Sequence, residues 1–328
     1  MKKIKILATG GTIAGKAASS TQLTGYTAGA YSVDDLLASV PALGELAQIS
    51  GEQLCNIDSS SITDALLLRL AQRCNELLVQ EDVDGVVITH GTDTMEETAF
   101  FLNLTVKSDK PVVLVGAMRP ATAVSADGPL NIINAVKTAV CAESAGQGVL
   151  VVMNDEIYGG RDVMKTNTAN VATFKAPNGG ALGCIVGGEV RYYYRSVRPH
   201  TLAAEFAISK VTALPRVDII YAHIGQDRVL VDAACAAGAR GLVYAGSGMG
   251  SIHGAVEAAL AEAVQSGVVV VRSSRTGSGR VSAGLARWQE QGFLYADNLN
   301  PQKARLLLQL ALLQTHERSE VQELLLRY

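Results

Sequence analysis

Short, nearly uninterrupted runs of valine, isoleucine and leucine recur along the chain, and stretches of helical spacing separate them. Such apolar runs predict β-strands that are covered on both faces. They occupy residues 4–8, 85–89, 112–116, 149–153, 217–222, 241–245 and 268–272. Because strands and helices alternate, the pattern predicts an α/β fold built on a doubly wound, mostly parallel sheet.

Helix-start signals precede several of the intervening stretches. Two capping boxes, at 32–35 and 94–97, predict helices over 36–40 and 99–106. A proline near the first turn, where its missing N–H costs little, marks two more helices. These are Pro129, for a helix over 130–139, and Pro301, for a helix over 302–315.

One segment breaks this alternation. Residues 194–215 carry several arginines and prolines and only one short helical patch. Such segments are typical of connections between domains. We therefore predict a larger N-terminal domain over 1–193, a linker over 194–215 and a smaller C-terminal α/β domain over 216–328.

The composition excludes several classes of function. Of the 328 residues, 48% are hydrophobic and 18% are charged, with a net charge of −3, which disfavours both disorder and a basic nucleic-acid surface. No apolar run reaches the roughly 18 residues of a membrane span. The five cysteines form no CxxC pair and the histidines no HxxxH pair. We therefore expect no metal site, and neither nucleic acid nor membrane as a partner.

The lysines at the start of the chain resemble the beginning of a secretory leader. Lys5 and the pair Gly10-Gly11 interrupt the apolar region that such a leader requires. We expect a cytoplasmic protein, or a periplasmic one if a leader has been removed. The scattered cysteines do not require an oxidising compartment.

Four polar, glycine-containing turns follow predicted strands, which is where ligands bind in open α/β sheets. The turns occupy residues 8–15, 89–98, 153–167 and 246–251. In order, they present Thr12, then Thr92 with Asp93, then Lys165, and finally Ser251, which stands where a dinucleotide-binding GxGxxG would have its third glycine. Each also has a structural interpretation: a glycine turn, a helix cap or a solvated lysine.

Taken together, these turns are more specific than any one alone. TGGTIAG at 9–15 and HGTDTMEETAFF at 90–101 resemble the two signature motifs of the bacterial L-asparaginases. Further similar runs are VLVGAMRP at 113–120, SADGPLN at 125–131, GRDVMKTNT at 160–168 and LNPQKARLLLQLAL at 299–312. The resemblance covers essentially the whole chain and is closest to the type II asparaginases and the glutaminase-asparaginases.

The resemblance implies hydrolysis of L-asparagine to L-aspartate and ammonia without a cofactor. It also implies a homotetramer, a dimer of intimate dimers, in which a neighbour's C-terminal domain completes each active site. Thr12 takes the position of the family's nucleophile, and Tyr26 that of its activating tyrosine on a mobile lid. Thr92, Asp93 and Lys165 take the positions of its second catalytic trio.

The same resemblance implies contacts with the substrate. Ser59 and nearby backbone groups would hold the α-carboxylate, and Asp93 would bind the α-ammonium group. The backbone N–H groups of Gly11 and Thr92 would face the oxyanion, a task worth about 2.7–4 kcal/mol per donor. The carbonyl of Ala117 would accept from the leaving amide.

This chain departs from the family at the substrate's amino end. Ser60 stands where glutamine or glutamate usually follows the substrate-binding serine, and Leu285 stands nearest the position of a C-terminal-domain glutamate. Ser251 is an accepted variant of the residue that the neighbouring subunit supplies. Fewer ammonium contacts predict a raised KM or an altered choice of substrate, since a charge-assisted hydrogen bond is worth roughly 1.5–3 kcal/mol.

Three alternatives stay open at this point. L-Glutamine could be an equal or better substrate, because one methylene is worth only about 1–3 kcal/mol. The chain could also be a nucleotide-binding or amide-sensing module that has lost turnover, or an asparaginase-like subunit of a tRNA amidotransferase. Release of ammonia from asparagine separates the enzymes from the binding modules.

Overall fold

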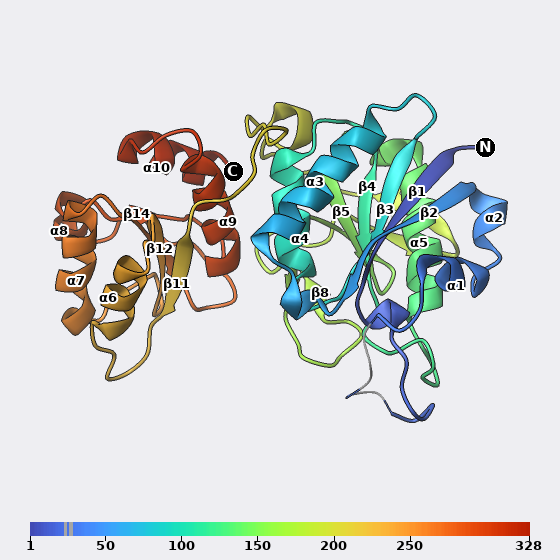
Figure 1. Ribbon diagram of the computed structural model, residues 1–328, viewed down its shortest axis with the longest axis horizontal. Coiled ribbons are helices and arrows are strands. Elements are labelled where there is room, and N and C mark those ends of the chain that lie inside the picture. The colour runs from blue at the N-terminus through green and yellow to red at the C-terminus, as the bar shows by residue number, and fades with distance from the viewer. Residues whose placement is uncertain (23–24, 26–28) are drawn as a thin grey trace. The chain divides into compact units, whose positions relative to one another are not determined.

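The computed structural model describes residues 1–22, 25 and 29–328, and two compact units share them (Figure 1). The first unit is Met1–Lys210 and the second is Val211–Tyr328, so the division falls inside the segment predicted as a linker. Most of that segment packs on the first unit: Phe206 and Ile208 are buried there. The ammonium group of Lys107 donates to the carbonyls of Thr201 and Ala204.

The first unit is built on an eight-stranded sheet in the order β10-β9-β6-β5-β4-β3-β1-β2. Strands β5, β4, β3, β1 and β2 run parallel, whereas β6, β9 and β10 are antiparallel. The bounds are β1 (Lys3–Gly10), β2 (Gln48–Ile57), β3 (Gly85–Thr89), β4 (Val112–Val115), β5 (Val149–Met153), β6 (Glu156–Gly159), β9 (Gly183–Val186) and β10 (Glu189–Tyr192). This mostly parallel sheet confirms the predicted fold class.

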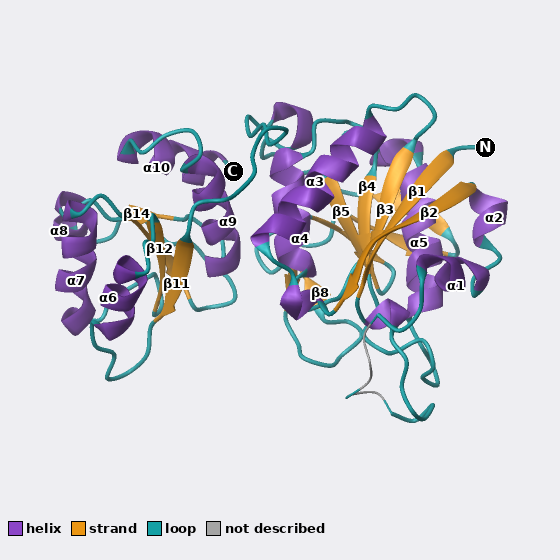
Figure 2. Cartoon of the chain, viewed as in Figure 1, coloured by secondary structure: helices purple, strands orange, loops and turns teal. Residues whose placement is uncertain are grey.

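Helices cover both faces of this sheet (Figure 2). α3 (Asp64–Leu78) and α4 (Met95–Thr105) pack together on one face. The other face is covered by α1 (Val33–Ala38), α2 (Leu43–Leu46) and α5 (Gly128–Val140). The sheet is thus the middle of three layers, which explains the buried Val/Ile/Leu runs of its central strands.

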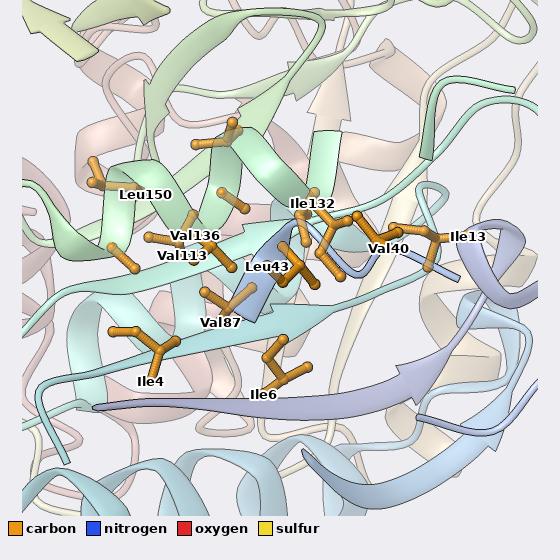
Figure 3. Packing of buried hydrophobic residues seen from close by; sticks show 14 of the residues in the cluster. Ile4, Ile6, Ile13, Val40, Leu43, Val87, Val113, Ile132, Val136 and Leu150 are labelled. Carbon is orange, nitrogen blue, oxygen red and sulfur yellow. The ribbon is translucent and has the colours of Figure 1, made fainter. Parts of the chain in front are cut away.

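Side-chain alternation along the strands builds the core under α5. Ile4 and Ile6 on β1 point to this face together with Val87 on β3, and Ile132 and Val136 of α5 pack against them (Figure 3). All five side chains are at most 1% exposed. Alternate side chains of the strands and the apolar face of α5 therefore pack together in one layer that is buried from solvent.

The helix-start predictions have mixed outcomes. The Ser32 hydroxyl accepts from the N–H of Asp35, and the Asp35 carboxylate accepts from the N–H of Ser32, which confirms the first capping box. The second is wrong: Thr94 is the N-cap residue of α4, but its side chain makes no capping hydrogen bond, and its hydroxyl instead donates to the Ser59 carbonyl at 2.9 Å. Pro129 and Pro301 lie in first turns as predicted.

The second unit is a smaller α/β layer structure. Its parallel sheet has the order β11-β12-β13-β14. The elements are β11 (Val217–Tyr221), α6 (Val229–Ala236), β12 (Gly241–Gly246), α7 (Gly254–Gln265), β13 (Val269–Ser274), α8 (Ala286–Glu290), β14 (Leu294–Tyr295), α9 (Pro301–Ala311) and α10 (Arg318–Arg327). None of the helices in the described ranges of either unit is long and apolar enough to cross a membrane.

Candidate active site

Three turns that follow adjacent strands touch one another at the carboxyl end of the first sheet. Gly11 follows β1 with φ +81° and ψ −170°, a conformation that essentially only glycine adopts. A Cβ on Gly11 would lie 2.3 Å from the Cα of Gly91, and a Cβ on Gly91 would lie 2.6 Å from the Ser59 hydroxyl oxygen. The turns after β1, β3 and β2 therefore meet only because two of the contacts involve glycine.

A cavity of about 460 Å³ opens beside these turns. Six residues predicted from the sequence line it: Gly11, Thr12, Ser59, Thr92, Asp93 and Lys165. The other described lining residues are Gly25, Asp58, Gly91, Met118, Arg119, Thr168 and Ala169. The structure thus brings the two threonines together with a lysine that lies more than seventy residues further along the chain.

Lys165 reaches the cavity from a separate two-stranded ribbon, β7 (Met164–Lys165) paired with β8 (Phe174–Lys175). Its ammonium group donates to the Thr92 hydroxyl oxygen at 3.0 Å and to the Asp93 carboxylate at 2.5 Å. Its backbone N–H donates to the buried Glu96 carboxylate at 2.7 Å. These contacts favour a functional interpretation of Lys165 over a solvated surface lysine.

Exposure differs sharply across this ion pair. The Lys165 side chain is 16% exposed, whereas that of Asp93 is 59% exposed in the single chain. Asp93 can therefore meet a ligand while it holds the lysine. The ion pair also places a proton donor directly on the oxygen of Thr92, whose own hydrogen is then available to another acceptor.

His90 is a structural residue of the same turn. Its ring is fully buried, with Nδ1 2.7 Å from the Gly91 carbonyl and Nε2 2.9 Å from the Thr98 hydroxyl. A carbonyl oxygen can only accept, so Nδ1 carries the proton and Nε2 accepts from Thr98. Burial lowers the pKa of His90 to about 4. The neutral imidazole therefore links the turn to α4 through its hydrogen bond with Thr98. His90 is not among the described residues that line the cavity.

One predicted role is wrong as stated. The Gly11 N–H was expected to face an oxyanion, but it donates to the Ile57 carbonyl at 3.0 Å. It is therefore committed to the strand pairing between β1 and β2. Gly11 still lines the cavity, where it permits close approach of the Gly91 turn.

Three other predicted site residues are not among the described residues that line the cavity, and a fourth is not described. Ala117 is fully buried directly before Met118, which lines the cavity. Ser60 is exposed, and it is not among the described residues that line the cavity. Tyr26 lies outside the described residues. Ser251 belongs to the second unit, where it closes a turn by exchanging backbone hydrogen bonds with Ser247 at 2.8 and 3.3 Å.

Leu285, the residue nearest the family's C-terminal-domain glutamate, is 45% exposed at the start of α8. The fully buried Arg272 donates to the carbonyls of Gly250, Ser282 and Ala283. It therefore ties the turn that carries Ser251 to the loop before Leu285, within the second unit.

The polar side chains that line the cavity are hydroxyls, carboxylates, one lysine and one arginine among the described residues. Within the described ranges, no group of three or more histidine, cysteine, aspartate or glutamate side chains could hold a metal ion. Two hydroxyls at strand ends, one of them hydrogen-bonded to an ammonium group, fit hydrolases that attack a carbonyl carbon with a side-chain hydroxyl.

Family models identify the particular family. The model described as "Asparaginase, N-terminal" matches residues 3–198, and the one described as "Glutaminase/Asparaginase C-terminal domain" matches residues 216–325. The chain therefore belongs to the asparaginase family of amidohydrolases.

Individual relatives are similar to this chain over nearly its full length. The chain is 50% identical to "L-asparaginase 2" of Bacillus subtilis (strain 168) over 322 residues, which is 98% of this chain and 85% of that protein. It is 43% identical to "Glutaminase-asparaginase" of Pseudomonas fluorescens biotype A, over 100% of this chain and 91% of that protein. The crystal structure of a "Probable Cytoplasmic L-asparaginase" from Campylobacter jejuni superposes with a TM-score of 0.98 at 50% identity, covering 100% of both chains.

Proposed function

We propose that this protein hydrolyses the side-chain amide of L-asparagine to L-aspartate and ammonia, with Thr12 as nucleophile. The observation that carries the proposal is the contact of Lys165 with Thr92 and Asp93 in the same cavity that Thr12 lines. Family membership supports hydrolysis of a side-chain amide, and the relatives named as L-asparaginases support asparagine as the substrate.

The chemistry requires that Thr12 gain nucleophilicity and that the leaving amine gain a proton. Attack of the Thr12 oxygen forms a C–O bond, and its proton passes to a base, the role the family gives to Tyr26. The C–N bond then breaks, and the nitrogen takes a proton and leaves as ammonia. Water hydrolyses the resulting ester, which yields aspartate and restores the hydroxyl.

Thr92 is the cavity hydroxyl best placed to give a proton to the leaving nitrogen. Lys165 donates to its oxygen, so Thr92 can give its own hydrogen to the departing nitrogen and be resupplied by the lysine. Asp93 keeps the ammonium group of Lys165 in place. Because the Gly11 N–H is already used, the oxyanion donors in this proposal are the backbone around Thr92 rather than Gly11.

The decisive experiment measures ammonia release from asparagine by Thr12→Ala, Thr92→Val and Lys165→Met. Matched controls are Thr212→Ala, at an exposed position, and Lys175→Met, on the strand paired with β7. Each of the three site variants should lose at least about 100-fold in kcat/KM, in line with the loss of a positioned acid–base group. Near-normal hydrolysis by folded Thr12→Ala and Thr92→Val would overturn the assignment.

L-Glutamine is the second candidate substrate. The relative from Pseudomonas fluorescens is named for both amides, and one extra methylene is worth only about 1–3 kcal/mol. We propose asparagine as the preferred substrate with measurable glutamine hydrolysis. A side-by-side determination of kcat/KM on the two amides tests the preference.

We also propose a homotetramer, a dimer of intimate dimers, in which Ser251 of a neighbouring subunit completes the site. The 59% exposure of Asp93 in the single chain fits a cavity that another surface covers. Light scattering tests the mass. Mixing Thr12→Ala with Ser251→Trp subunits tests the sharing, because hybrid tetramers should regain activity that neither parent has.

A cytoplasmic location is the remaining part of the proposal. The solved structure from Campylobacter jejuni is titled a probable cytoplasmic asparaginase. All five cysteines here are free thiols, which suits a reducing compartment. Cell fractionation of the protein expressed from its own gene tests this location.

A further inference from the structure

Arg272 is a fully buried arginine in the middle of β13, in the second unit. No ion pair within the described ranges involves it. Burial lowers the pKa of its guanidinium group, so the surroundings oppose its charge. An apolar side chain of similar size would fill the same space without this desolvation cost. Packing alone therefore does not explain an arginine at this position.

The guanidinium group binds backbone carbonyls of two segments that are separate in the chain. Its Nη1 donates at 3.3 Å to the carbonyl of Gly250, which directly precedes Ser251 in the turn 247–251. Its Nη2 donates to the carbonyls of Ser282 and Ala283, to the second at 2.9 Å. One side chain thus joins the turn 247–251 to the loop that precedes α8.

Trp288 of α8 holds the plane of this group. The guanidinium carbon lies 4.4 Å from the centroid of the Trp288 ring, which is 6% exposed. Gly284 makes the arrangement possible, because a Cβ there would lie 2.9 Å from Nη1 of Arg272 and 2.7 Å from Cε3 of Trp288. A stacked, planar guanidinium group directs its donors along fixed lines, whereas a lysine ammonium group on its flexible stem does not. The geometry is therefore specific for arginine.

We propose that Arg272 is a positioning residue for Ser251: by holding the turn 247–251 against the loop 282–284, it fixes where the Ser251 side chain stands. This inference rests on the proposed function, in which Ser251 completes the active site of a neighbouring subunit. The Ser251 residue is exposed, so packing does not hold its side chain in place. Its backbone hydrogen bonds with Ser247 close the turn on itself, and Arg272 attaches that turn to the loop.

The test measures kcat and KM for asparagine by ammonia release. It compares the wild type with Arg272→Lys, Arg272→Met, Ser251→Ala and the double variant of Arg272→Lys with Ser251→Ala. The matched control is Arg305→Met, because Arg305 also donates to a backbone carbonyl of the second unit, that of Val217 at 3.0 Å. Val217 pairs with Gly241 at the start of β12, whereas the turn that carries Ser251 follows the end of that strand.

Two further measurements check the structure of each variant. Amide hydrogen exchange follows the backbone of 247–251 and 282–284, and thermal melting follows the protein as a whole. Trp288 is the only tryptophan of the chain, so its fluorescence shows whether α8 still packs around residue 272. If Arg272→Met does not fold, Arg272→Lys, which keeps the positive charge, carries the test.

Arg272→Lys should raise KM for asparagine about three- to tenfold and change kcat by less than about twofold, because a substrate contact moves while the reacting groups stay in place. Amide exchange should become faster in 247–251 and 282–284 and stay unchanged in β11. In the Ser251→Ala background the same substitution should raise KM by less than about twofold, because both changes act through one contact.

A wild-type KM or wild-type exchange of 247–251 in folded Arg272→Lys and Arg272→Met overturns the inference, as does an equal rise in KM for Arg305→Met. Effects of Arg272→Lys and Ser251→Ala that multiply overturn it as well, because Arg272 would then act through another group. If the wild type releases no ammonia from asparagine, the proposed hydrolysis fails. Faster exchange confined to 247–251 and 282–284 would then still support Arg272 as the residue that positions the turn, and unchanged exchange would overturn it.

Discussion

Gly11→Ala tests the close approach of the two threonine turns. The new methyl group would lie 2.3 Å from the Cα and 2.4 Å from the nitrogen of Gly91, where ordinary contacts begin at 3.4 Å. Both obstacles are backbone atoms, so no side chain can rotate away. The turns after β1 and β3 must therefore separate by about 1 Å, and Thr12 and Thr92 would separate with them.

The magnitude follows from two costs. The conformation of Gly11 is nearly exclusive to glycine and costs another residue about 1–3 kcal/mol. Overpacking adds about 1–3 kcal/mol. For a unit of this size the resulting loss of about 2–6 kcal/mol lowers Tm by about 4–24 °C. A displacement of about 1 Å at the reacting groups can cost roughly 100-fold in rate.

The matched control is Gly146→Ala. Gly146 also has a positive φ, +70°, but a Cβ there would meet nothing within 4 Å. It should lose about 1–2 kcal/mol from backbone strain alone and keep normal turnover. Calorimetry gives Tm, and ammonia release gives kcat/KM. If Gly11→Ala matches Gly146→Ala in both quantities, the reasoning about the touching turns is refuted.

Three further predictions concern residues around this site and the first helix. Burial lowers the pKa of His90 to about 4, so between about pH 6.5 and 4 its imidazole binds a proton in the unfolded state but not in the folded state. The unfolding free energy should therefore fall by up to about 1.4 kcal/mol for each unit by which the pH is lowered through this range. Denaturant titrations should show a weaker dependence of the unfolding free energy on pH for His90→Asn. Thr94→Val removes the donor to the Ser59 carbonyl, so KM for asparagine should rise several-fold with little change in kcat, as steady-state kinetics would reveal. Ser32→Ala breaks the capping box with Asp35 and should cost about 1 kcal/mol by chemical denaturation, and a simultaneous loss of activity would contradict its purely local role.

The central parallel strands could be predicted because both of their faces are buried. β3, β4 and β5 therefore have continuous apolar sequences, and β1 has one that only Lys5 interrupts within the predicted range; the bounds of all four agree with the prediction within two residues. β2 could not be predicted, since it lies at the sheet edge and mixes polar with apolar residues. The helices α3, α6 and α7 have neither a capping box nor a proline in the first turn, so their starts could not be predicted in the same way as those of α1 and α9.

The errors at the site follow from that missed strand. Thr12 and Thr92 were predictable because each follows an apolar strand. The N–H of Gly11 was assigned to an oxyanion because its real partner, Ile57, lies on β2. Asp58 also follows β2, so its place beside the cavity depends on a register that the sequence pattern alone does not give. The same limit applies to Thr94, whose hydroxyl bonds to a turn 35 residues earlier.

The contribution of Lys165 from a separate ribbon has a consequence for protein synthesis. The hydroxyl that it contacts belongs to a turn made 73 residues earlier, and strands β4 and β5 lie between them in the chain. A growing polypeptide can assemble the threonine turns well before this lysine leaves the ribosome. A partly synthesised chain should therefore be able to form the cavity without being active. Hydrolysis would begin only after β7 and β8 have been synthesised and have packed against the threonine turns.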